Sequence, residues 1–236
     1  MVLSIVPFPF YLLGLRKRFF LYAGLVFHSA YIVSRGFELG RLPLVGPHDT
    51  LFFVSASVVA FSIPFSISLG NDLRFRRAMV LTAVTFAFFS IISRPHNTPL
   101  PPVLKTLWFE LHVVLAFLSY GLFAIGAVLA ALFLNSGDDE LEGLQYRAIF
   151  VGYWLFSLSM IFGGVWAYLA WGTYWLWTPK ELWTSIVWVY YSLYLHARLI
   201  RGWTGKPLAV LGIAGFIVVM FTYLGVSLLM KSSHTF

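Results

Sequence analysis

The sequence contains no cysteine in its 236 residues. Disulfides, thiolate metal sites and a haem attached covalently to this chain through a Cys-x-x-Cys-His motif are therefore excluded. Charged residues are also scarce, at 11% of the chain, against roughly 25% in ordinary globular proteins. The chain also lacks the repeated period-2 alternation with turn signals that an outer-membrane barrel needs. Together these absences argue against both a soluble domain and a barrel.

Apolar sequence, in contrast, is abundant, because hydrophobic residues make up 60% of the chain. Stretches long enough to cross about 30 Å of hydrocarbon recur from one end to the other. We therefore expect an all-α polytopic membrane protein that forms one transmembrane domain over residues 1–236 in the lipid bilayer. The eight expected spans cover about residues 1–15, 18–35, 50–70, 77–93, 107–134, 148–167, 183–201 and 207–230.

The basic residues divide unequally between the two sides of these spans. One side has ten of them: Arg16, Lys17, Arg18, Arg74, Arg76, Arg77, Arg147, Arg198, Arg201 and Lys206. The other side has six: Arg35, Arg41, Arg94, Lys105, Lys180 and Lys231. The positive-inside rule makes the first set cytoplasmic and places both termini outside. An acidic loop over residues 138–142 would be on the cytoplasmic side. Basic and aromatic residues do not interleave on a polar surface, so no nucleic acid is expected as a partner.

Tryptophan is concentrated in one segment, since residues 163–198 hold six of the nine tryptophans. So much flat aromatic surface at a membrane edge suits a large planar hydrophobic ligand. The alternative is an aromatic belt, in which Trp and Tyr gather at the interface without binding anything. We expect residues 166–183 to form an outer loop. Within it, Thr178-Pro179-Lys180-Glu181 fits a capping box with proline at the first helical position.

Two histidines lie within expected spans, where ionisable side chains are costly and usually functional. His196 lies roughly 20 Å along its span from Trp183, and His28 roughly 15 Å from the cytoplasmic end of its own span. One face of the seventh span, with Ser185, Val189 and Ser192, leaves room beside His196. The two histidines could ligate one intramembrane haem. The alternative for each is a neutral imidazole hydrogen-bonded between helices.

Two further histidines lie on the outer side with the tryptophans. His112 is near the start of the fifth span and His234 is just beyond the last one. Two neutral imidazoles facing each other across a haem plane would make a bis-histidine iron site. The alternative for His112 is an interfacial histidine bonded to Glu110 or to a loop carbonyl. His48 and His96 are expected to be solvated loop residues.

The tryptophan segment resembles the WWD signature, commonly written WGxYWxWDPKE, of the haem-handling cytochrome c assembly proteins. Eight residues match, and Thr178 stands where the family has Asp: the matches are Trp171, Gly172, Tyr174, Trp175, Trp177, Pro179, Lys180 and Glu181. Residues 36–53, the helix start around His112, and residues 223–236 are also similar, in the family's order. The likeness is to the CcsA/ResC branch of System II.

The resemblance implies a membrane subunit that takes haem b from the cytoplasmic side and presents it outside to the Cys-x-x-Cys-His thiols of an apocytochrome c. His196 would then be the intramembrane haem ligand, with His112 and His234 as the outer pair. His28, or a residue of a CcsB/ResB-like membrane partner, would complete the deep site. The resemblance also implies that the tryptophans cradle the haem edge: Trp166, Trp171, Trp175, Trp177 and Trp183. The subunit would belong to a holocytochrome c synthase (haem lyase) in a bacterial cytoplasmic or thylakoid membrane.

Two other functions remain compatible with the residues. The chain could be a haem-b electron-transfer subunit, with His28 and His196 on one haem and His112 and His234 on another. Such a subunit would exchange electrons with quinone or an outer multihaem cytochrome. A third possibility is a structural assembly subunit that binds no haem.

Overall fold

The computed structural model describes residues 2–95 and 97–229, and its regular secondary structure there is helical throughout. The expected all-α class is confirmed for these residues. The chain divides into two compact units, residues 1–99 and residues 100–236.

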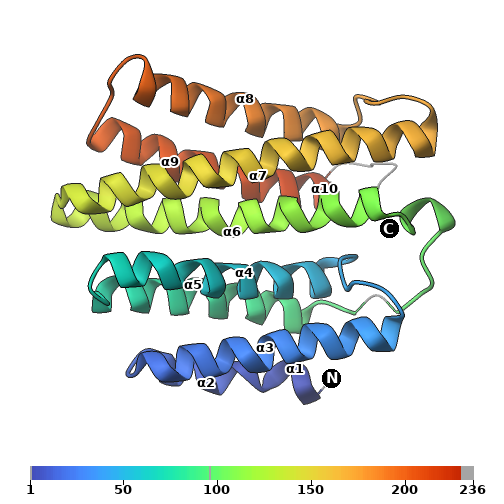
Figure 1. The fold of residues 1–236 in the computed structure, drawn as a ribbon, viewed down its shortest axis with the longest axis horizontal. Helices are drawn as coiled ribbons and strands as arrows, with labels where there is room; N and C mark the ends of the chain where they lie inside the picture. Colours follow the sequence, from blue (N-terminus) through green and yellow to red (C-terminus); the bar gives the residue numbers. More distant parts are fainter. Residues whose placement is uncertain (1, 96, 230–236) are drawn as a thin grey trace. The chain divides into compact units, whose positions relative to one another are not determined.

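The first unit is built of two helical hairpins. The shorter one joins α1 (Val2–Ile5) and α2 (Pro7–Gly14) to α3 (Arg18–Leu39), and the other joins α4 (Pro47–Ser68) to α5 (Leu73–Ile92). α2 packs against α3, and α4 packs along α5 (Figure 1). Gly40 ends α3 with a φ of 62°, a left-handed conformation that glycine adopts without steric cost.

The second unit is organised around one long hairpin. α6 (Leu107–Ser136) and α7 (Asp139–Trp171) run side by side (Figure 1). α8 (Pro179–Leu199) and α9 (Lys206–Met220) follow. α9 continues through the π-helical turn η2 (Phe221–Gly225) into α10 (Val226–Leu229), and the short 3₁₀ helix η1 (Pro102–Leu104) precedes α6. α9 packs on α6 and α8, so the core of this unit lies between the long hairpin and its two covering helices.

Five helices in the described part of the chain are long and apolar enough to cross a membrane. They are α4, α5, α6, α7 and the continuous helix Lys206–Gly225. These five match the expected spans 50–70, 77–93, 107–134, 148–167 and 207–230. The polytopic membrane character of the protein follows from them. Spans at 1–15, 18–35 and 183–201 stay a prediction.

The prediction of an acidic loop over residues 138–142 is wrong. Residues 138–142 are the start of α7, because Asp138 is its N-cap and accepts a hydrogen bond from the backbone N–H of Glu140 at 3.1 Å. Acidic side chains are favourable at this position, where the helix dipole is positive. Glu142 is buried and pairs with Arg198 of α8 at 3.1 Å. Its charge therefore holds two helices together.

Candidate functional site

The tryptophan segment consists of the end of α7, a short connection and the start of α8. Trp166 and Trp171 lie in the last turns of α7, and Trp183 lies in the first turns of α8. The expected loop over 166–183 is therefore shorter, because only residues 172–178 are outside helices. Gly172 ends α7 with a φ of 76°. Trp177 also has a positive φ, 56°, which a bulky side chain rarely adopts and which must be held by its surroundings.

The turn is held from the α8 side by a complete capping box, as the sequence predicts. The Thr178 hydroxyl accepts from the Glu181 backbone N–H at 3.4 Å, while the Glu181 carboxylate accepts from the Thr178 N–H at 3.0 Å. The same carboxylate oxygen accepts from the N–H of Leu176 at 2.9 Å. Glu181 thus binds the chain on both sides of Trp177. Burial lowers the pKa of the neighbouring Lys180 ammonium below its usual value.

The tryptophans of this segment differ in exposure. Trp166 is buried, and its indole N–H donates to the Val103 carbonyl at 2.8 Å, so it ties η1 to α7. Trp171 and Trp177 are exposed, at 43% and 69%. Trp175 and Trp183 are half-buried, and the Trp183 ring lies 4.5 Å from that of Phe221, centroid to centroid. The rings of Trp171 and Trp177 therefore form an exposed aromatic surface, whereas Trp166 is part of the packing between η1 and α7.

His112 lies beside the start of this segment, although the two are more than fifty residues apart in sequence. The backbone carbonyl of Ser159 in α7 is 2.9 Å from Nδ1 of His112. One turn earlier on α6, the Phe109 ring packs on Trp166 at 5.3 Å, centroid to centroid. His112 is thus hydrogen-bonded, and its partner is a helix carbonyl instead of Glu110 or a loop carbonyl. Its role as an outer haem ligand stays a prediction.

His28 is fully buried within the first unit. The Tyr11 hydroxyl contacts its Nδ1 at 2.7 Å, and the Phe52 ring packs edge-on at 4.1 Å, centroid to centroid. Its Nε2 is buried and has no hydrogen-bond partner in the described part of the chain. Sequence reasoning missed Tyr11, because nothing in the short apolar α2 marks its hydroxyl as a partner.

His196 lies in the last turn of α8 and is exposed. Val189, on the face expected to leave room beside it, is 49% exposed. Ser192, on the same face, is half-buried, and its hydroxyl lies 2.8 Å from that of Tyr153 on α7. This face of α8 is therefore open at Val189 and His196 and packed at Ser192. His28 belongs to the first unit and His196 to the second, so a shared haem between them stays a prediction. His234 lies outside the described residues.

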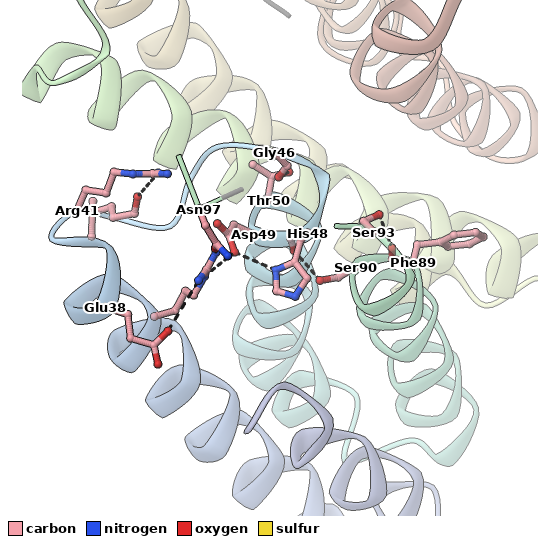
Figure 2. A network of polar contacts seen from close by, with 12 residues as sticks. Glu38, Arg41, Gly46, His48, Asp49, Thr50, Phe89, Ser90, Ser93 and Asn97 are labelled. Atoms are coloured by element: carbon pink, nitrogen blue, oxygen red, sulfur yellow. Dashed lines mark hydrogen bonds and ion pairs between the residues drawn. The ribbon is translucent and has the colours of Figure 1, made fainter. Parts of the chain in front are cut away.

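The expectation that His48 is a solvated loop residue is wrong. His48 is buried in the first turn of α4, and its Nδ1 lies 2.9 Å from Oδ1 of Asp49 (Figure 2). Arg35 of α3 donates from Nε to the same oxygen at 3.3 Å and from its NH2 group to Asn97 Oδ1 at 2.6 Å. Arg35 and Asp49 carry opposite charges within predominantly apolar sequence, and this pattern was the signal that could have revealed the network. His96 lies outside the described residues.

These features define a class of protein: a helical membrane protein that holds a tryptophan-rich turn at the end of a helix, with a histidine of the neighbouring helix packed on that same helix. The family model described as cytochrome C assembly protein matches residues 45–234, and the chain belongs to that family.

Three relatives illustrate the similarity, and each is a cytochrome c biogenesis protein CcsA. The one from Guillardia theta is 34% identical over 86% of this chain and 79% of its own length. The one from Chlamydomonas reinhardtii is 36% identical over 87% of this chain and 64% of its own length. The one from Synechocystis is 29% identical over 88% of this chain and 84% of its own.

Proposed function

We propose that this protein is the haem-handling membrane subunit of a cytochrome c synthase, which presents haem b on the outer face for attachment to apocytochrome c. Membership of the cytochrome c assembly family and the similarity to CcsA proteins support a role in cytochrome c biogenesis. The observation that carries the proposal is that His112 packs on α7 at Ser159 and Gly163, about two helical turns before the exposed ring of Trp171. A histidine packed on the helix that leads to exposed flat rings suits an iron-bearing planar ligand.

The residues at this place fit haem on chemical grounds. A backbone carbonyl only accepts hydrogen bonds, so its contact with Nδ1 of His112 requires the proton on that nitrogen. The lone pair of the neutral ring is then on Nε2, the form in which histidine binds a metal. His112 would hold haem through Nε2, and the bound haem would supply the group that is attached to the apocytochrome. His234 is proposed as the second outer ligand.

The chain's own residues would perform three tasks in this reaction. The exposed rings of Trp171 and Trp177 offer apolar surface to the porphyrin and exclude water from it. The Glu181 carboxylate keeps the turn that carries these rings in one conformation. His112 holds the haem in one orientation, so that its edge stays accessible to the thiols of the apocytochrome.

A deeper site at His196 is part of the same proposal. The open face of α8 would contact lipid or a CcsB/ResB-like partner, which could complete the iron coordination. The subunit would lie in a bacterial cytoplasmic or thylakoid membrane, with both termini and the tryptophan turn outside.

The test is to replace the outer ligand and supply it again. His112→Gly protein, purified in detergent, should retain less haem per chain than wild type by Soret absorbance. Added imidazole should restore the spectrum, because it fills the vacated coordination position. The thermal melting of both haem-free proteins checks that the fold is intact. A His112→Gly variant with full haem and an unchanged spectrum would contradict the proposal.

The same preparation separates this function from electron transfer. A handling site holds haem in substoichiometric amounts and loses it when imidazole is raised far above the concentration that restores the His112→Gly spectrum. Two b-haems per chain that survive purification and cycle between redox states would instead support the electron-transfer subunit.

A further inference from the structure

The ring of His112 occupies space that exists only because residue 163 is glycine. A Cβ atom at Gly163 would lie 2.6 Å from Nδ1 of His112, 3.0 Å from Cε1 and 3.2 Å from Cγ. The atoms in the way belong to an imidazole ring, which moves only as a whole. Gly163 is buried inside α7, and at such a position glycine lowers helix stability by up to about 1 kcal/mol relative to alanine. The close packing of the His112 ring explains why a glycine is present here despite this cost.

One helical turn earlier, Ser159 holds the same histidine at two points. Its backbone carbonyl is 2.9 Å from Nδ1, and its Oγ is 3.1 Å from the same nitrogen. The hydroxyl donates to the backbone carbonyl of His112 at 2.8 Å. With its proton used in this way, Oγ can only accept from Nδ1–H. Both contacts therefore favour the tautomer with hydrogen on Nδ1.

We propose that Ser159 and Gly163 are positioning residues for His112: Ser159 fixes its tautomer and Gly163 admits its ring. The inference rests on the proposed function, in which Nε2 of His112 binds haem iron. Residues that hold the second nitrogen of a ligating histidine orient the ring and raise its basicity, and their loss commonly weakens binding about 10-fold to 100-fold. Neither residue contacts the iron.

The chain provides a matched control for Gly163. A Cβ atom at the next residue, Gly164, would meet only the Tyr174 carbonyl at 3.7 Å, which is ordinary van der Waals contact. Gly163→Ala and Gly164→Ala make the same chemical change in the same helix, with a similar gain in helix propensity. Haem titration should show about 10-fold or greater weakening for Gly163→Ala. Gly164→Ala should stay within about twofold of wild type, because its Cβ atom makes only this ordinary contact and does not meet His112.

A second readout needs no haem. In haem-free protein labelled with ¹⁵N-histidine, the shifts of the His112 ring nitrogens report which one carries the proton. Wild type should show the proton on Nδ1. Gly163→Ala should alter these shifts, and Ser159→Ala should do so to a smaller extent, because the Ser159 carbonyl remains. Gly164→Ala should leave them unchanged.

The outcomes separate the inference from the proposed function. Should His112→Gly keep full haem, the proposed function fails, whatever the glycine variants do. Equal haem affinity in Gly163→Ala and Gly164→Ala overturns the inference while leaving the function standing. A proton on Nε2 also overturns it. A Gly163→Ala effect of equal size in the His112→Gly background would show general packing damage and overturn the inference as well.

Discussion

At the scale of single residues, Thr178 lacks the negative charge that Asp has at this position of the family motif. It keeps the helix-capping geometry of that Asp. Both Asp and Thr cap helix starts by accepting a backbone N–H bond, and Thr178 makes that bond as part of a full capping box. The negative charge that the motif has at this position is absent, and Glu181 is the carboxylate that remains in the turn. The hydrogen bonds show why the substitution is tolerated structurally.

We expect Thr178→Val to lower the stability of the protein by about 1 kcal/mol through the lost cap. Thr178→Ser and Thr178→Asp should be nearly neutral, because both retain an acceptor. Thermal unfolding in detergent measures the difference. Thr184→Val is the control, because the Thr184 hydroxyl donates to the Lys180 carbonyl of its own helix and caps nothing. A sharp change in haem content in Thr178→Asp would mean that charge matters there.

The buried charges of the first unit make a second residue-scale prediction. The side chain of Asp49 is 1% exposed and that of its partner Arg35 is 9% exposed. Removing one partner of a buried pair leaves the other charge uncompensated and costs about 3–5 kcal/mol. Asp49→Ala should therefore lower the melting temperature strongly. Glu38→Ala should have little effect, since Glu38 is 64% exposed and 3.8 Å from Arg35.

At the scale of elements, the long hairpin depends on glycines at the contact between α6 and α7. A Cβ atom at Gly126 would lie 2.8 Å from Cγ1 of Ile149 on the facing helix. Small residues of this kind let helix backbones approach closely inside membranes. We expect Gly126→Val to destabilise the hairpin by about 1–3 kcal/mol through overpacking.

Gly143 of α7 is the matched control for Gly126. A Cβ atom there meets nothing within 4 Å, so Gly143→Val should be neutral or slightly stabilising. Thermal melting or unfolding in denaturing detergent measures both variants. Equal destabilisation of the two would show that helix propensity, rather than the contact, governs the hairpin.

The turn before α5 provides a pH dependence. The Asp72 carboxylate caps α5 by accepting from the backbone N–H groups of Arg74 at 2.6 Å and Phe75 at 3.0 Å. Burial acts to raise the pKa of this carboxyl, but the hydrogen bonds from Arg74 and Phe75 outweigh it and hold the pKa below its usual value of 3.8. A depressed pKa contributes stability above the unfolded-state value, and this contribution is lost as the pH falls through the folded-state value.

The free energy of unfolding should therefore differ between wild type and Asp72→Asn by a constant amount from about pH 5 upwards. The difference should shrink as the pH falls below the ordinary value of 3.8. Parallel melting curves at a series of pH values measure this. A difference that grows at low pH would contradict the assignment.

At the scale of the whole molecule, the absence of cysteine makes the orientation directly testable. Any single cysteine introduced becomes the only thiol in the chain. Tyr174→Cys, at a 60% exposed position in the tryptophan turn, should react with a membrane-impermeant maleimide added to intact cells. Arg201→Cys, after α8, should react only after permeabilisation. The reverse pattern would invert the proposed topology.

Much of this architecture could be predicted because hydrophobic length alone determines it. α4 to α7 and the helix from Lys206 follow from apolar runs, and the Thr178 cap follows from four consecutive residues. Contacts between distant residues could not be predicted, since apolar periodicity does not specify which helix faces meet. The contact of Arg35 with Asn97 and the Ser159–His112 contact are of this kind. The acidic start of α7 was missed because its charges cap a helix.

The length of the α6–α7 hairpin has a practical consequence. The two helices have 30 and 33 residues, and only Gly137 and Asp138 join them. At 1.5 Å per residue they are about 45 Å and 50 Å long, against a hydrocarbon layer of about 30 Å. The exposed tip around Asn135 therefore reaches into the headgroup layer or beyond it. A helical fusion partner grafted in phase at residues 137–138 would project rigidly into solvent. For a 26.7 kDa chain with five helices long and apolar enough to cross a membrane in its described part, such a graft gives electron cryomicroscopy a particle with a recognisable orientation.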